Sequence, residues 1–172
     1  MEFKNKEFEC KNFFNVDFAN KSFSNSNFIE CVFENCNLSN INVENSRMRD
    51  VVFKNCKILG VDFTKCNKFL LSFNFKDCLI SMSIFSNLEL TGTSFNNCKI
   101  FECDFIKTNL SKSNFKNSDL RGSRFENSNL SLASFRDAKN YSINPNENIL
   151  KKTKFSIPEV IGLLDMVDIE LE

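Results

Sequence analysis

The sequence holds eight cysteines and no histidine, a combination that limits the chemistry its side chains can perform. Without histidine there can be no Ser–His–Asp triad, no Cys–His dyad, no histidine metal ligand and no histidine general base. The cysteines show no CxxC spacing of the kind that holds zinc. No Gly-rich phosphate loop is present either. The sequence therefore predicts no catalytic residue, no metal ligand and no bound cofactor.

An apolar residue recurs at every fifth position through most of the chain. The series slips by two residues around Lys68 and then continues in a new frame. All 26 members are apolar although only 42% of the chain is hydrophobic, so the pattern is not accidental. They are Phe3, Phe8, Phe13, Phe18, Phe23, Phe28, Phe33, Leu38, Val43, Met48, Phe53, Ile58, Phe63, Phe75, Ile80, Phe85, Leu90, Phe95, Ile100, Phe105, Leu110, Phe115, Leu120, Phe125, Leu130 and Phe135.

This period matches neither an α-helix nor a flat strand. Residues five apart on a helix are rotated by about 140°, so the apolar side chains would surround the whole circumference. In a strand they would alternate between the two faces. The chain must therefore turn a corner in every quintet, which predicts a solenoid with short strand-like sides and inward-pointing apolar centres.

The positions around each centre support a solenoid. Small residues, including seven of the eight cysteines, stand two places before the centres, where a large inward ring leaves room only for a small neighbour. Asparagines and three of the four glycines, Gly60, Gly92 and Gly122, stand two places after the centres. Gly and Asn tolerate the positive φ of a corner. We therefore expect the cysteines to be reduced packing residues.

Quintets such as Ser113–Asn117, Ser118–Gly122 and Ser128–Leu132 make the sequence resemble the pentapeptide-repeat proteins. The resemblance covers residues 1–139 and implies an all-β fold, a right-handed quadrilateral β-helix with four quintets per coil. The repeat length gives about seven coils, with a two-residue bulge near residues 68–72. The family consensus has Asp or Asn just before each centre for structural reasons. This implies that Asp62 and Asp104 are solvated or corner-bonded, and we expect no enzyme.

Four-sided stacking sorts the centres into columns at intervals of 20 residues. Two opposite columns are rich in phenylalanine, and the other two are mainly aliphatic. One phenylalanine column, the predicted core ladder, contains Phe13, Phe33, Phe53, Phe75, Phe95, Phe115 and Phe135. The predicted inward thiol ladder contains Cys36, Cys56, Cys78 and Cys98. Neighbouring strands lie about 4.8 Å apart, so these thiols should touch, but parallel side chains suit packing better than disulfides.

Both ends depart from the repeat. Lys6, Lys11 and Lys21 occupy inward small-residue positions, so the first coil should be open to solvent and its lysines directed outward. Residues 140–172 are expected to form a partial last coil, a C-terminal helical cap and an acidic tail. Ser156–Glu159 has capping-box spacing, with Pro in the first turn of the predicted helix. The apolar residues of this helix are Val160, Ile161, Leu163, Leu164 and Met166.

These apolar residues have two possible roles. They could form an intramolecular lid over the last coil, or a dimer interface, because related family members pair through their C-terminal ends. The lid is the favoured interpretation, and with it a monomer.

Charge separates the candidate functions. Family members that inhibit or protect DNA gyrase, including quinolone-resistance proteins of the Qnr type, are DNA mimics and need an acidic surface. Residues 1–155 hold 22 bases against 17 acids, whereas residues 156–172 hold five acids and no base. No acidic stripe and no large projecting loop is visible. The sequence therefore favours an interaction or structural rod with an unidentified protein partner, and a gyrase-directed DNA mimic is the alternative.

Two further partners are disfavoured by the sequence. Bases are interspersed with acids and outward aromatics such as Phe14 and Phe101 are few, which argues against direct nucleic-acid binding. The N-terminus has no apolar stretch of signal-peptide type, and no run reaches the length of a transmembrane helix. We expect a cytoplasmic protein without membrane contact.

Overall fold

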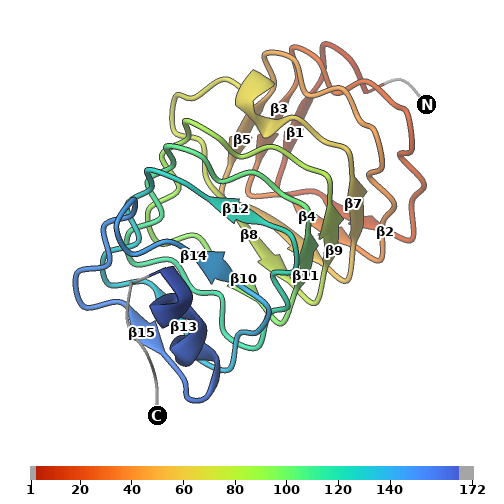
Figure 1. Cartoon of the computed structure of the whole chain (residues 1–172). Coiled ribbons are helices and arrows are strands. Elements are labelled where there is room, and N and C mark those ends of the chain that lie inside the picture. Colours follow the sequence, from red (N-terminus) through yellow and green to blue (C-terminus); the bar gives the residue numbers. More distant parts are fainter. Residues whose placement is uncertain (1–2, 167–172) are drawn as a thin grey trace.

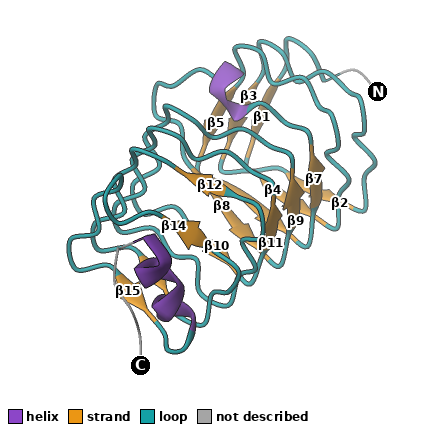
Figure 2. Cartoon of the chain, viewed as in Figure 1, coloured by secondary structure: helices purple, strands orange, loops and turns teal. Residues whose placement is uncertain are grey.

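The computed structural model describes residues 3–166 of the chain. The chain winds into a parallel β-solenoid of about seven coils stacked along one axis (Figure 1). The first coils lie at one end of the rod and the last coils at the other. Short strands and isolated bridges alternate with turns along the coils, and in the described part of the chain helix is confined to two short segments (Figure 2).

Each strand spans only two to four residues, because every quintet ends at a corner. The strands are β1 (Glu7–Glu9), β2 (Asn12–Phe14), β3 (Asn27–Ile29), β4 (Val32–Glu34), β5 (Arg47–Arg49), β6 (Val51–Lys54), β7 (Lys57–Leu59), β8 (Phe73–Lys76), β9 (Leu79–Ser81), β10 (Phe95–Asn96), β11 (Lys99–Phe101), β12 (Arg124–Phe125), β13 (Ser134–Phe135), β14 (Ser142–Ile143) and β15 (Lys154–Phe155). The two 3-10 helices are η1 (Phe63–Lys65) and η2 (Glu159–Met166).

All strand pairs are parallel and join one coil to the next. The sheets have the orders β1-β3-β5, β2-β4-β6-β8-β10, β7-β9-β11, β12-β14 and β13-β15. Phe13 lies opposite Phe33, which is the predicted interval of 20 residues. Isolated bridges such as Asp17 with Asn37 continue the rungs where no strand is assigned. The register therefore places equivalent positions of successive quintets directly above one another.

The corners have a left-handed backbone. Asn117 has a φ of 60° and Gly122 a φ of 70°, as the sequence pattern predicts for the second position after a centre. A Cβ atom at Gly122 would also lie only 3.2 Å from Cγ of Glu102. Met82 and Leu132 adopt the same conformation, with φ values of 51° and 62°, although this costs an L-residue about 1–2 kcal/mol. The rungs on both sides of a corner impose its geometry even on unfavourable residues.

Stacked phenylalanine rings fill the core. Neighbouring rings of the core ladder lie 4.8–5.3 Å apart with planes within 18° of each other, and the ladder extends beyond Phe135 to Phe155. A second stack on the opposite side contains Phe63, Phe85, Phe105 and Phe125. The two stacks meet edge to face: Phe85 and Phe95 are 5.7 Å apart with an interplanar angle of 89°. This geometry suits the quadrupole of the rings.

The bulge changes the core as well as the surface. The two extra residues lie between Asn67 and Ser72, so that Phe53 faces Phe75 at an interval of 22 residues. Phe69 at the tip is 73% exposed. The buried ring of Phe73 stands in a small-residue position and contacts other core rings. It fills the space that the missing apolar centre leaves, a compensation that the repeat pattern did not identify.

At the C-terminal end the last coil is irregular. Phe125 faces Ile143 at an interval of 18 residues, so the centre is Ile143 and the strict five-residue frame fails locally. Tyr141 packs against the rings of Phe135 and Phe155 and completes the core there. Residues 143–149 then restore the frame, and Asn129 bridges Ile149 at the usual interval.

The capping-box prediction is wrong. Oγ of Ser156 accepts from the N–H of Asp137 at 3.0 Å and donates to the carboxylate of Asp137, so this hydroxyl bonds the previous coil and does not cap the N–H of Glu159. Helix η2 is a 3-10 helix over Glu159–Met166. The N–H of Ile161 donates to the carbonyl of Pro158, 2.9 Å away, which is the i to i+3 bond of a tighter helix. Gly162 lowers the helical propensity of this short segment.

Only one side of η2 covers the end of the rod. Leu163 is buried and Val160 is half-buried, whereas Ile161 and Leu164 are exposed. Val160 and Leu163 thus contribute to the cover over the last coil, and Ile161 and Leu164 do not. The side chain of Met166 and the acidic residues after it lie outside the described part of the chain.

Candidate functional site

The inward thiols are packing groups that take the place of serine hydroxyls. Sγ of Cys56 donates to the carbonyl of Phe33 and Sγ of Cys78 to that of Phe53, each across 3.4 Å. Further along the same column, Oγ of Ser118 donates to the carbonyl of Phe95 at 2.6 Å and accepts from the N–H of Cys98. Cys36 and Cys98 belong to this column and are buried. The predicted thiol ladder thus binds the backbone of neighbouring coils.

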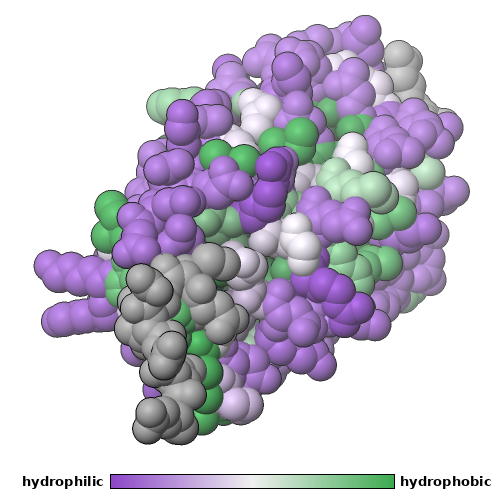
Figure 3. Space-filling model, viewed as in Figure 1, coloured by the Kyte–Doolittle hydropathy of each residue, from purple (hydrophilic) through white to green (hydrophobic). Residues whose placement is uncertain are grey.

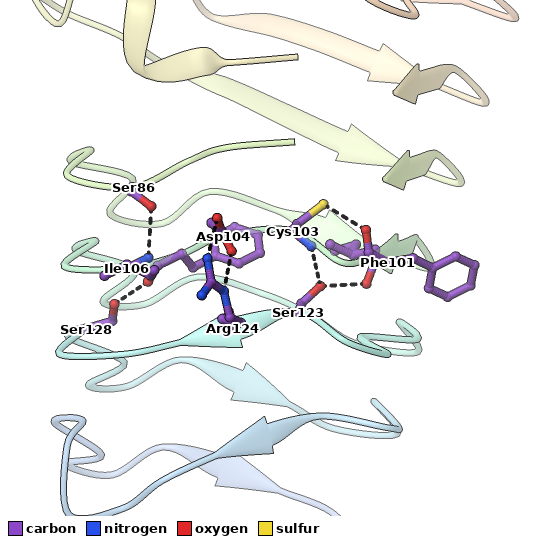
Figure 4. Close-up of polar contacts among 10 residues, drawn as sticks. Ser86, Phe101, Cys103, Asp104, Ile106, Ser123, Arg124 and Ser128 are labelled. Carbon is purple, nitrogen blue, oxygen red and sulfur yellow. Dashed lines mark hydrogen bonds and ion pairs between the residues drawn. The ribbon is translucent and has the colours of Figure 1, made fainter. Parts of the chain in front are cut away.

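A second inward column repeats this pattern (Figure 4). The N–H of Cys103 donates to Oγ of Ser123 at 3.2 Å, and that hydroxyl donates to the carbonyl of Ile100. Sγ of Cys103 donates to the carbonyl of Phe101. Small polar side chains in the interior therefore satisfy backbone groups between rungs, which buried polar groups require.

Burial favours the neutral form of two inward thiols. It raises the pKa of Cys66 and of Cys103 to about 12. The hydrogen bond with Cys78, together with burial, raises the pKa of Cys56. All eight cysteines are free, and Cys10 is the exposed one. Because the thiolate is the nucleophile and the metal-binding form, the buried thiols are poorly suited to catalysis or metal binding at neutral pH.

The carboxylates singled out by the sequence make structural contacts. Oδ1 of Asp62 accepts a hydrogen bond from the N–H of Thr64 at 3.0 Å, which is the expected corner bond. Asp104 instead forms a two-pronged ion pair with Arg124 on the next coil, at 2.7 and 2.8 Å (Figure 4). Within residues 3–166 no group of three or more cysteine, aspartate or glutamate side chains could hold a metal ion.

The outer surface offers a groove of about 570 Å³ along one corner of the rod. The groove lies where the sheet β2-β4-β6-β8-β10 meets the sheet β7-β9-β11. Its residues are Asn55, Cys56, Lys57, Asp77, Cys78, Leu79, Asn97, Cys98, Lys99, Asn117, Asp119 and Lys139. The thiol ladder lies beneath it, and exposed amide, carboxylate and lysine side chains line it. The five-residue pattern did not predict this groove, because it defines the inward positions, whereas exposed residues of one corner, such as Asn55 and Lys57, line the groove.

Bases gather on both sides of this groove. We call the "basic corner" the seven exposed bases Lys54, Lys57, Lys76, Lys99, Lys116, Arg136 and Lys139. Lys54 and Lys76 are adjacent on one side of the corner, and Lys57 and Lys99 flank Leu79 on the other. By contrast, the opposite surface around β1, β3 and β5 mixes Glu7 and Glu9 with Arg47 and Arg49. The charge of the rod is therefore unevenly distributed.

Two models of one family match the chain. The model described as "Pentapeptide repeat region" matches residues 6–85. The model described as "Pentapeptide repeats (8 copies)" matches residues 98–137. Together these ranges cover well over half of the 172 residues.

The chain belongs to the pentapeptide-repeat family.

Solved structures of pentapeptide-repeat proteins share the fold. A trypsin-treated form of QnrB1, a plasmid-mediated fluoroquinolone resistance protein, is similar with a TM-score of 0.54 and 20% identity, over 99% of this chain and 93% of that one. A second trypsin-treated form gives a TM-score of 0.52 and 17% identity, over 100% and 98% of the two chains. HetL, a pentapeptide-repeat protein from the cyanobacterium Nostoc, is more distant, with a TM-score of 0.33 and 15% identity over 89% and 88%. No curated protein sequence matches the chain.

The predicted fold class, a β-solenoid of pentapeptide repeats, is thus confirmed. The quintet pattern that identifies the family occupies the interior and the corners, so it carries information about stacking and little about binding. The visible face of the rod is mainly hydrophilic with small scattered hydrophobic patches (Figure 3). No helix in the described part of the chain is long and apolar enough to span a membrane.

Proposed function

We propose that this pentapeptide-repeat protein is a non-catalytic interaction rod that binds a protein partner along its outer surface. The observation that carries the proposal is that the inward and outward side chains of each quintet have different roles. Inward side chains pack or bind backbone groups, as Phe95 and Ser118 do, and leave only outward positions free to vary. A rigid rod with regularly spaced outward side chains suits recognition, as in other solenoid proteins.

The test begins with the immobilised full chain and an extract of its source organism. Each retained protein is then purified, and its affinity for the chain is measured with the isolated pair. The proposal expects at least one protein that binds reversibly and remains chemically unchanged. Consumption or modification of the bound molecule by the rod would contradict the non-catalytic part, and failure of every purified candidate to bind would contradict the interaction part.

A DNA mimic that modulates gyrase is the second candidate, favoured by the similarity in fold to QnrB1. Mimicry of duplex DNA requires an ordered negative surface. The basic corner and the excess of 22 bases over 17 acids in residues 1–155 oppose it. A gyrase supercoiling assay with and without ciprofloxacin separates the candidates. We expect neither inhibition nor rescue at micromolar protein, and rescue from the drug would favour the gyrase function.

A further inference from the structure

We infer that the groove along the basic corner binds an extended acidic segment of a partner protein, an inference that rests on the proposed function and assigns it a surface. The first support is uncompensated charge. None of the seven bases of the basic corner forms a side-chain hydrogen bond or ion pair within residues 3–166. Elsewhere Arg124 is paired with Asp104, and Arg121 with Asp119. Charge that the fold leaves free in this way attracts an anionic ligand.

The second support is the regular placement of these bases. Register sets them in two columns on either side of the groove, one containing Lys54 and Lys76 and the other Lys57 and Lys99. The basic section runs from the coil of Lys54 to that of Arg136, about 19 Å at the spacing of parallel strands. An extended peptide of about six residues spans this length. A short acidic stretch therefore matches the groove.

The third support concerns the chemistry of the groove. Three acids lie among the seven bases: Asp77 and Asp119 line the groove, and Asp137 follows Arg136. Nδ2 of Asn97 donates to Asp77 at 2.6 Å. The amides can donate to peptide C=O groups and accept from peptide N–H groups, and the carboxylates can accept from peptide N–H groups, whereas a phosphate backbone has no N–H to donate.

Single-stranded nucleic acid would also need aromatic platforms for its bases. The outward ring of Phe101 is covered by the guanidinium of Arg121, 5.7 Å from its centroid. Phe14 lies in the first coil, outside the basic section, and Phe69 lies on the bulge. The groove is thus better suited to polypeptide than to nucleic acid.

The same columns also give the site a direction. In the first two coils they carry Asp17 and Glu34, and Glu34 pairs in register with Lys54, the first base of the section. The negative section of the partner should therefore lie over the later coils. Its continuation over the first coils should be neutral or basic.

A fluorescein-labelled octaglutamate peptide provides the test, read by fluorescence anisotropy with the full chain. We expect saturable, salt-sensitive binding that weakens at least tenfold in the double variant Lys76→Glu, Lys99→Glu. The matched control Lys65→Glu, Lys107→Glu changes net charge equally at the opposite corner, and it should alter affinity less than threefold. Thermal melts of both variants verify that they fold.

Two results would overturn the inference. One is an equal loss of affinity in the two double variants, which would mean that net charge alone attracts the peptide. The other is tighter binding of an oligo(dT) strand of equal charge that displaces the peptide from the wild-type groove. Neither result bears on the proposed function, which stands if a purified partner binds another surface of the rod.

Discussion

At the residue scale, each inward side chain has an identifiable neighbour on the coils before and after it. The ring of Phe95 is fully buried and stacks on Phe75 and Phe115 at 5.0 and 4.9 Å. Truncation of such a ring leaves a cavity that the rigid ladder cannot close. Each coil of a solenoid contacts only its neighbours, so a weakened coil also weakens the contact between the parts of the rod on either side of it.

Phe95→Ala should lower the free energy of unfolding by about 3–5 kcal/mol, as measured by urea denaturation. The control is Phe14→Ala, because Phe14 is also a phenylalanine on a strand of this column but is 58% exposed. It should change stability by less than about 0.5 kcal/mol. Equal effects of the two substitutions would show that the assigned inward frame is wrong.

The buried thiols should make the fold sensitive to alkaline pH. In the unfolded chain Cys66 and Cys103 lose their protons near their ordinary pKa of 9.0, whereas in the fold the pKa of each is raised to about 12. The unfolded state therefore binds fewer protons between these pH values, so stability is complete below pH 9 and declines as pH rises toward 12.

Urea midpoints measured between pH 8 and 10.5, about the range where this effect begins, provide the measurement. The wild-type midpoint should fall more steeply with pH than that of the double variant Cys66→Ser, Cys103→Ser. Serine is the matched replacement because Ser123 and Ser46 occupy the equivalent inward positions one coil away from Cys103 and Cys66. Parallel slopes for both proteins would refute the linkage to these thiols.

At the element scale, the bulge shows how the fold tolerates an interruption of its repeat. The two inserted residues direct Phe69 outward, and Phe73 turns a large ring into the vacated interior. Its centroid lies 5.2 Å from that of Phe63 and 5.3 Å from that of Phe75. The space left by the neighbouring side chains therefore determines the size of the residue at this position. Beside the bulge that space is large enough for a phenylalanine ring.

Phe73→Ala should destabilise the protein by about 3 kcal/mol or more, comparable with loss of a central ring. Phe69→Ala in the same bulge should change the free energy of unfolding by less than about 0.5 kcal/mol, because Phe69 is 73% exposed. Thermal or urea denaturation of both variants gives the comparison. A neutral Phe73→Ala would mean that the bulge does not depend on this ring.

The sequence predicted those elements whose residue types are dictated by stacking. The five-residue period defined the centres, the inward cysteines and the positive φ at Asn117 and Gly122, because each follows from local sterics repeated at every coil. It did not identify the centre Ile143, where the spacing changes, or the 3-10 form of η2. Such irregularities depend on contacts with the previous coil, which no local pattern contains.

The period of five defines the inward positions and therefore did not identify the candidate site. Lys76 and Lys99 are outward residues of two adjacent sides, and the register of the coils stacks their columns along one corner. The total charge suggested a basic rod without a location. The groove emerged from the three-dimensional arrangement of residues that the repeat leaves unconstrained.

At the scale of the whole molecule, the rod separates a uniform interior from an exterior that differs around its circumference. The basic corner lies on two of the four sides, whereas the early coils mix acids such as Glu7 and Glu30 with bases such as Lys6 and Lys11. A partner that recognises this distribution of charge must bind one side of the rod and leave the other sides free. The account therefore predicts a binding surface with a fixed position around the axis.

Site-specific photocrosslinking tests whether the partner binds at one fixed position around the axis of the rod. One variant carries p-benzoylphenylalanine in place of Leu79, which lies in the groove. Two further variants carry it on the other sides of the rod. They replace Glu44, which follows the inward Val43, or Thr91, which follows the inward Leu90. Each variant is irradiated with the purified protein partner. The account predicts adducts from position 79 and none above background from positions 44 and 91. Adducts of equal or greater yield from position 44 or 91 would contradict it.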